Sequence, residues 1–187
     1  MTASTCWGYG IHESDSALDW EFALRKVAGA ADRAVTPDER QRQQVKLERG
    51  LPTMLTLLQE EAALPESGEA YIAQGHQVLA SLLMDAGCAF PEEVRSLLVA
   101  GIEACPEFTM AQILKAGKDQ PIDVLRVAHL FADHGRLGPQ GTADRLNGRF
   151  LAIESLLKNL REYDLTGSHP VMLLQPRQPL YATPAHG

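Results

Sequence analysis

Apolar residues recur at spacings of three and four along most of the chain, in stretches that open at a cap residue or proline and close at glycine or proline. This pattern is typical of amphipathic α-helices, which turn one face to a core. The sequence therefore predicts an all-α fold, a single multi-helix domain of about seven helices. The expected helices cover residues 14–34, 36–58, 68–86, 90–105, 109–116, 121–135 and 142–164.

The clearest helix start is the run Thr36-Pro37-Asp38-Glu39. Thr36 is suited to be the N-cap, Pro37 fits the first turn, and Glu39 stands where a carboxylate can return to the cap residue. Further along the same helix, Gly50 and Pro52 interrupt the pattern, and they predict a break or a kink there.

The last 21 residues differ from the rest of the chain because prolines recur through them. Proline excludes a helix and permits only an extended path. We expect a helical domain over residues 1–166, followed by an extended Pro-rich tail over 167–187. A chain of 187 residues fits one hydrophobic core.

Composition is that of a globular protein, with 45% hydrophobic and 22% charged residues. No apolar run is long enough for a membrane span, and residues 1–10 do not resemble a signal peptide. We therefore expect a cytoplasmic protein without a membrane partner. The three cysteines, Cys6, Cys88 and Cys105, form no CxxC pair, which indicates reduced thiols.

The net charge of −7 is unevenly distributed. Between Gly50 and Val94 the chain has seven acidic residues and no Lys or Arg, whereas residues 25–49 hold seven basic and four acidic residues. Binding to a phosphate backbone requires a basic face, so the distribution disfavours nucleic acid. An acidic helical surface instead favours a protein partner.

The most distinctive segment runs from Trp7 to Trp20, with the sequence WGYGIHESDSALDW. It resembles the opening of a bacterial family of uncharacterised small helical domains, which begin Trp-Gly-x-Gly-x-Phe-acidic-Asn-Asp-x-Ala-x-Asp-Trp. Two positions depart from that pattern, since His12 replaces a Phe and Ser14 an Asn. The resemblance implies a helical domain and no established activity. The matching residues are Trp7, Gly8, Gly10, Glu13, Asp15, Ala17, Asp19 and Trp20.

Four residues of this segment, His12, Glu13, Asp15 and Asp19, are candidates for a metal site or an acid–base pair. Asp15 and Asp19 are four residues apart and so share one face of the expected helix. The structural interpretation, which we favour, is that Asp15 caps the helix, Asp19 holds a neighbouring group and Trp20 lies in the core. The signature residues Trp7, Gly8, Gly10, Ala17 and Trp20 are then structural.

Other candidate groups point to structure rather than chemistry. His129 and Asp133 are four residues apart, whereas His129 and His134 lie about 140° apart around a helix, which makes shared metal ligation awkward. Cys88 and Cys105 flank an expected helix and would be about 20 Å apart, too far for a disulfide. The chain has no phosphate-binding loop, nucleophile elbow, metalloprotease or dinucleotide motif, so we expect no cofactor.

Two functions remain open. The first is a non-enzymatic cytoplasmic domain that binds a protein through the acidic stretch, as an acidic inhibitor or an immunity-type protein does. The alternative is a metal-dependent hydrolase or another enzyme built on His12, Glu13, Asp15 and Asp19. We favour the first. The sequence does not predict an oligomeric state.

Overall fold

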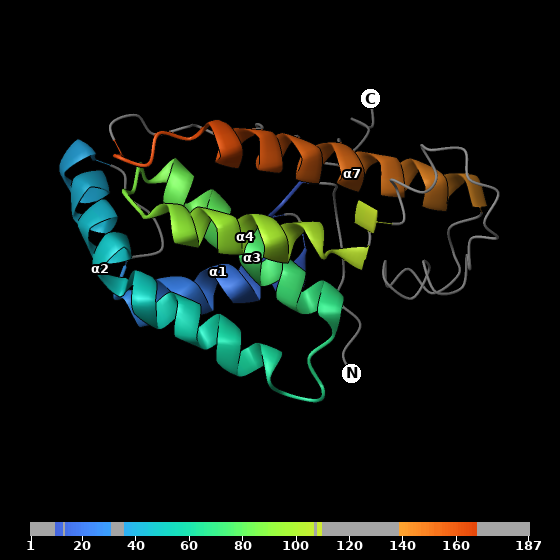
Figure 1. The fold of residues 1–187 in the computed structure, drawn as a ribbon, viewed down its shortest axis with the longest axis horizontal. Coiled ribbons are helices and arrows are strands. Elements are labelled where there is room, and N and C mark those ends of the chain that lie inside the picture. The colour runs from blue at the N-terminus through green and yellow to red at the C-terminus, as the bar shows by residue number, and fades with distance from the viewer. Residues whose placement is uncertain (1–9, 13, 31–35, 107, 110–138, 168–187) are drawn as a thin grey trace, which may run out of the picture.

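The computed structural model describes residues 10–12, 14–30, 36–106, 108–109 and 139–167, with the backbone alone over 139–147. These residues form five helices and no strand, which confirms the all-α prediction for this part of the chain (Figure 1). The expected helix over 121–135, nearly all of the one over 109–116 and the tail after Gly167 lie outside the described residues. The helices are α1 (Asp15–Ala28), α2 (Pro37–Ala62), α3 (Glu69–Asp85), α4 (Glu92–Glu103) and α7 (Pro139–Glu162).

Helix α1 is shorter than its sequence pattern suggests. It ends at Ala28 because Gly29 adopts a left-handed conformation, with φ +66°, and donates its N–H to the carbonyls of Arg25 and Lys26. Glycine adopts this conformation without a Cβ penalty and is therefore a common helix stop. The expected continuation of the helix through residue 34 is wrong at this point.

Helix α2 begins as predicted. Thr36 Oγ1 accepts the N–H of Glu39 at 3.2 Å, and Glu39 Oε2 accepts the N–H of Thr36 at 2.9 Å, so the capping box is complete. The expected interruption is not a break, since Pro52 lies inside one continuous helix. The helix does change direction along its length (Figure 1), in agreement with the alternative prediction of a kink.

The boundaries of the later helices are close to those expected. The α3 helix ends beside Gly87, which has φ +70°, and α4 follows Pro91 as its N-cap. Helix α7 begins at Pro139, three residues before the expected start at 142. Proline at the first helical position loses no intrahelical hydrogen bond, so it is compatible with this earlier start.

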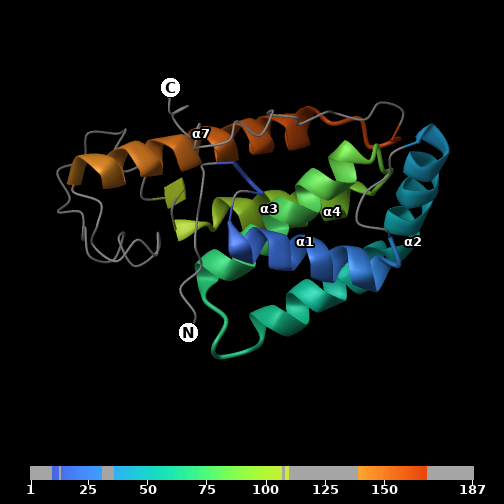
Figure 2. The ribbon, with the colours of Figure 1, turned by 180° about the vertical axis from the view of Figure 1, so that it is seen from behind.

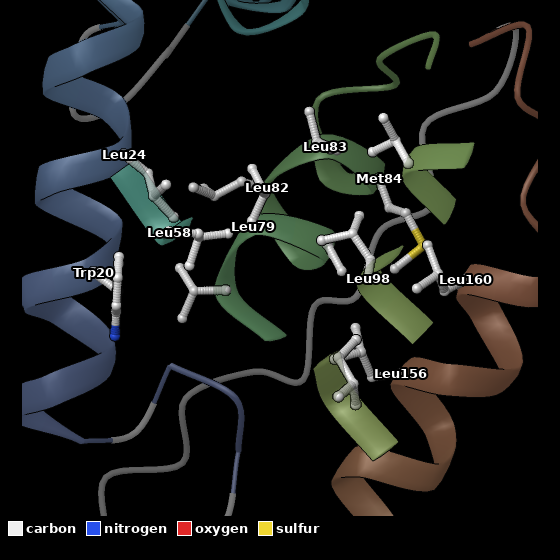
Figure 3. Close-up of a cluster of buried hydrophobic side chains, with 14 of the residues drawn as sticks. Trp20, Leu24, Leu58, Leu79, Leu82, Leu83, Met84, Leu98, Leu156 and Leu160 are labelled. Carbon is white, nitrogen blue, oxygen red and sulfur yellow. The ribbon is translucent and has the colours of Figure 1, made fainter. Parts of the chain in front are cut away.

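Helix α3 is the centre of the molecule and packs against α1, α2, α4 and α7. Residues 77–84 of this helix are all buried. Figure 3 shows Trp20 and Leu24 of α1 and Leu58 of α2 on one side of α3, and Leu98 of α4 with Leu156 and Leu160 of α7 on the other. A helix buried all round organises one continuous core.

The C-terminal end of α7 is fastened to the turn between α3 and α4. The hydroxyl of Tyr163 donates to the carbonyl of Cys88 at 2.9 Å, and the Tyr163 ring stacks on Phe90 with centroids 5.4 Å apart. Arg95 of α4 donates to the carbonyls of Arg161 and Tyr163 at 3.1 and 3.2 Å. These contacts satisfy carbonyls that a helix end leaves without partners.

Among the described residues, none of the helices combines the length and apolar character needed to cross a membrane.

Candidate functional site

The start of α1 is held by Ser14, which the sequence analysis did not single out as the cap. Ser14 Oγ accepts the N–H of Ala17 at 3.1 Å and a hydrogen bond from Gln74 Nε2 of α3 at 2.6 Å. The prediction that Asp15 caps the helix is therefore wrong. Asp15 is the first helical residue and is exposed, where its carboxylate still suits the positive end of the helix dipole.

His12 lies between α1 and α3 and contacts both. Its Nε2 is 2.9 Å from Ser81 Oγ of α3, and its Nδ1 is 3.0 Å from Glu21 Oε2 of α1. The other oxygen of Glu21 accepts a hydrogen bond from Arg25 Nε at 3.0 Å. The hydrogen bond from His12, aided by the charges of His12 and Arg25, lowers the pKa of Glu21 to about 2.

The order serine, imidazole, carboxylate is also that of a hydrolase triad. Ser81, however, is 2% exposed and lies in the interior of α3, where a substrate carbonyl has no approach. Its hydroxyl is also 3.5 Å from Asp85 Oδ2, one turn further along α3. We interpret the contacts of His12 as a structural link between the N-terminal segment, α1 and α3.

The four predicted site residues are not brought together as far as the structure describes them. Asp15 and Asp19 are exposed on α1, His12 is half-buried against Ser81 and Glu21, and Glu13 lies outside the described residues. Within the described part of the chain, no group of three or more His, Cys, Asp or Glu side chains is placed to hold a metal ion. The metal-site hypothesis, which includes Glu13, stays a prediction.

The signature residues that the structure describes have structural contacts. Ala17 and Trp20 are buried in the core, and Trp20 Nε1 donates to the carbonyl of Tyr71 at 2.9 Å. The rings of Trp20 and Tyr71 are 4.9 Å apart. A Cβ on Gly75 would lie 2.8 Å from the indole, so the absence of a side chain there makes room for Trp20. Trp7 and Gly8 lie outside the described residues.

A buried arginine fixes the N-terminal segment from a distant helix. Arg149 of α7 is 4% exposed and donates to the carbonyl of Gly10 and to Gln77 Oε1 of α3, both at 2.9 Å. Gln77 is fully buried, and its Nε2 has no hydrogen-bond partner among the described residues. The sequence pattern did not predict the roles of Arg149, Gln77, Ser81 and Glu21. The available signal was that Gln77 and Ser81 are the two polar residues in an otherwise apolar run.

Cys88 and Cys105 are both buried, and neither forms a disulfide bond within the described part of the chain. Burial, together with the nearby charge of Glu48, raises the pKa of Cys88 to about 12. A thiol with such a pKa is a poor nucleophile at neutral pH. The candidate group His129, Asp133 and His134 lies outside the described residues.

The acidic stretch between Gly50 and Val94 does not form one surface. Helix α3, about 25 Å long, separates two acidic groups. One group lies where α2 passes into α3, and the other lies at the turn from α3 to α4 (Figure 1). We call the first group the acidic corner, formed by Glu60, Glu61, Glu66 and Glu69; the second group consists of Asp85, Glu92 and Glu93.

The two acidic groups differ in ion pairing rather than in exposure. Glu60, Glu66 and Glu69 of the acidic corner are exposed and Glu61 is half-buried. All three residues of the second group are exposed, and one of them, Glu92, is paired with Arg95. Leu64 lies between these carboxylates in the chain and is 41% exposed. Burial, together with the negative charges of Glu61 and of Asp19 on α1, raises the pKa of Tyr71. Asp19 therefore adds negative charge on the side of α1 that faces this corner.

Basic side chains gather instead on the first half of α2. Arg42, Lys46 and Arg49 line a shallow hollow of about 530 Å³ together with Asp38, Gln41 and Val45. The first half of α2 has four basic and three acidic residues, whereas the charged residues of the second half are Glu60 and Glu61, so the helix becomes more negative toward its C-terminal end.

Comparison of the chain with models of known protein families, with curated proteins and with solved structures finds no match.

Proposed function

We propose that this chain is a non-enzymatic, cytoplasmic protein-binding domain that takes a basic partner on the acidic corner. The observation that carries the proposal is that Glu60, Glu61, Glu66 and Glu69 lie within ten residues of chain, on both sides of the exposed Leu64, where α2 passes into α3. Complementary charge steers association and selects partners, and an apolar side chain within a charged rim supplies area to bury. The family that residues 7–20 resemble has no established activity, so the resemblance does not favour either a binding protein or an enzyme.

The chemistry of the corner defines the class of partner. Four carboxylates over a short span, without Lys or Arg in the sequence from Gly50 to Val94, match a protein surface rich in Lys and Arg. An inhibitor or immunity-type protein that blocks a basic enzyme has this kind of surface. We therefore expect association that weakens steeply as salt is raised.

The test is affinity capture from the native host with three forms of the full chain. The corner variant carries Glu60→Lys and Glu66→Lys, and the matched control carries Asp85→Lys and Glu93→Lys at the second acidic group. We expect the wild type and the control to retain the same protein at a stoichiometric level, and the corner variant to lose it. Circular dichroism confirms that all three forms remain folded.

Two results would overturn the proposal. One is a partner that the corner variant retains as well as the wild type does. The other is a stoichiometric metal ion, seen by native mass spectrometry on protein purified without chelators and lost on Asp15→Ala and Asp19→Ala substitution. The second result would favour the alternative of a metal-dependent enzyme.

A further inference from the structure

The outer face of α1 carries a row of exposed side chains, which we call the α1 stripe: Asp15, Leu18, Asp19, Phe22 and Lys26. Their spacing of three, four, seven and eight residues places them on one side of the helix. The other side holds Ala17, Trp20 and Leu24, which are buried in the core. Figure 2 views the molecule from the side on which α1 lies in front of α3.

The centre of the stripe is apolar and open. Phe22 is 60% exposed and Leu18 is 39% exposed, one helical turn away. Lys26 Nζ lies 6.0 Å from the centre of the Phe22 ring, so the ammonium covers part of the ring face. Val27 is also exposed on α1, outside the stripe, whereas the exposed Val45, Leu64, Leu97 and Leu151 come from four other segments. The α1 stripe thus presents two large apolar side chains one turn apart. Adjacent apolar side chains of this kind mark a contact surface more often than single ones do.

Charge along the stripe changes sign from one end to the other. Asp15 and Asp19 lie toward its N-terminal end and Lys26 toward its C-terminal end. Asp19 and Lys26 are seven residues apart and therefore lie within about 20° of one another around the helix. A second copy of the same helix, laid antiparallel with its axis of symmetry near Phe22, brings each Asp19 opposite the Lys26 of the other copy.

We propose that the α1 stripe is the interface of a symmetric homodimer, in which two α1 helices pack antiparallel. Phe22 of each copy forms the apolar centre, with one Asp19–Lys26 pair on either side of it along the helix axis. Leu18 of each copy lies just beyond a pair, opposite Val27 of the other copy, which is also exposed. A twofold interface must be complementary to itself, and a helix with opposite charges at its two ends and apolar residues between them meets that requirement. The proposed partner is a second copy of this chain because the stripe itself carries both the anion, Asp19, and the cation, Lys26, that form the pairs.

The expected dimer is weak. Helix α1 has 14 residues and is about 21 Å long, so the contact lies at the small end of specific interfaces, about 1,200 Å² or less in total. Such an area corresponds to a reversible equilibrium between monomer and dimer. The stripe approaches the acidic corner at Asp19, whose charge acts on Tyr71 together with that of Glu61. The dimer proposal does not depend on the partner proposed above.

The experiment is sedimentation velocity of the full chain from low micromolar to several hundred micromolar protein. We expect the wild type to shift from monomer to dimer, and Phe22→Glu to remain monomeric throughout. The matched control is Leu151→Glu, because Leu151 is 50% exposed on α7 and lies outside the stripe. This control should dimerise as the wild type does.

A charge swap tests the antiparallel arrangement itself. Asp19→Lys alone and Lys26→Asp alone each place like charges opposite one another and should weaken dimerisation at least tenfold. The double variant with both substitutions restores opposite charges and should recover most of the affinity. The helix dipole by itself would make the double variant the least stable helix, because that variant has a cation toward the N-terminal end of α1 and an anion toward its C-terminal end. Recovery in the double variant therefore reports pairing between copies.

Three results would each overturn the proposal. The first is a wild-type chain that stays monomeric at every concentration, and the second is a dimer that Phe22→Glu leaves intact. The third is a double variant that is weaker than either single variant. Circular dichroism melts of every variant separate loss of the interface from loss of the fold.

Discussion

The guanidinium of Arg149 on α7 donates to the carbonyl of Gly10 at 2.9 Å and joins two segments 139 residues apart in the chain. The same guanidinium donates to Gln77 in the middle of the core helix. The N-terminal segment is thus held from the far end of the sequence through one buried, charged side chain. Substitution of Arg149 would take the same donor away from two buried acceptors. Such a loss lowers the stability of the fold more than loss of a surface ion pair does.

We expect Arg149→Met to lower the free energy of unfolding by about 2–4 kcal/mol, measured by urea denaturation. The matched control is Arg161→Met on the same helix. Arg161 pairs with Glu103 at the surface, where both side chains are about half exposed, and its loss should change stability by no more than about 1 kcal/mol. Equal effects of the two substitutions would contradict the role given to Arg149.

The link from His12 to Glu21 predicts a dependence of stability on pH. The pKa of Glu21 is lowered from 4.5 to about 2 in the fold, so the folded state favours the carboxylate. The resulting stabilisation is present above pH 4.5 and is lost as the pH falls toward 2. We expect Glu21→Gln to lower the unfolding free energy by about 2 kcal/mol at about pH 5, with the difference vanishing near pH 2.

The measurement is thermal or urea unfolding of wild type and Glu21→Gln across that pH range. Asp19→Asn, which removes an exposed carboxylate from the same helix, serves as the control and should give a much smaller difference. A constant gap between wild type and Glu21→Gln from pH 5 to 2 would show that the substitution acts through packing alone.

Substitution of Gly50 tests whether close helix packing outweighs helix propensity at this position. Alanine is the better helix former by about 1 kcal/mol, yet a Cβ on Gly50 would lie 2.6 Å from the Cα of Ala28. Backbone at that distance cannot move aside unless α1 and α2 separate. We expect Gly50→Ala to destabilise the fold by about 1–3 kcal/mol by denaturation. Gly68→Ala, where the added carbon meets open space, should change stability by less than about 1 kcal/mol.

Cys88 and Cys105 should resist alkylation in the native protein and react once it is unfolded in urea. Both thiols are buried, and the pKa of Cys88 is raised to about 12, so little thiolate forms at mildly basic pH. Mass spectrometry of peptides after iodoacetamide treatment reads each site. Ala89→Cys places a thiol on the exposed neighbour of Cys88 and should be labelled rapidly in the native state. Equal labelling at 88 and 89 would contradict this prediction.

Local features were predictable from the sequence because their partners are close in the chain. Thr36 and Glu39 form the capping box three residues apart, and Gly87 follows α3 as a stop. The two errors at the ends of α1, the cap residue and the last helical residue, also concern residues that are close in the sequence. Asp15 and Ser14 are both good caps, and the sequence does not determine which side chain turns back to the helix.

The surroundings of His12 could not be predicted in the same way. Its contact with Ser81 spans 69 residues and depends on how α1 and α3 cross. The prediction of one acidic surface between Gly50 and Val94 was wrong for a related reason. Helix α3 passes through the core, and the acidic residues that flank it therefore lie at its two opposite ends. Sequence order fixes the charge of a segment, whereas packing decides which charges share a face.

The contact between Arg149 and Gly10 also has a consequence for synthesis. A chain emerging from the ribosome exposes Gly10 and His12 early, but the donor that holds Gly10 lies on the last described helix. Until α7 has emerged, the carbonyl of Gly10 lacks this donor, and α3 and α4 lack their contacts with α7. Translation therefore passes through a stage in which α1 to α4 have been made but the contact between Gly10 and Arg149 cannot yet form.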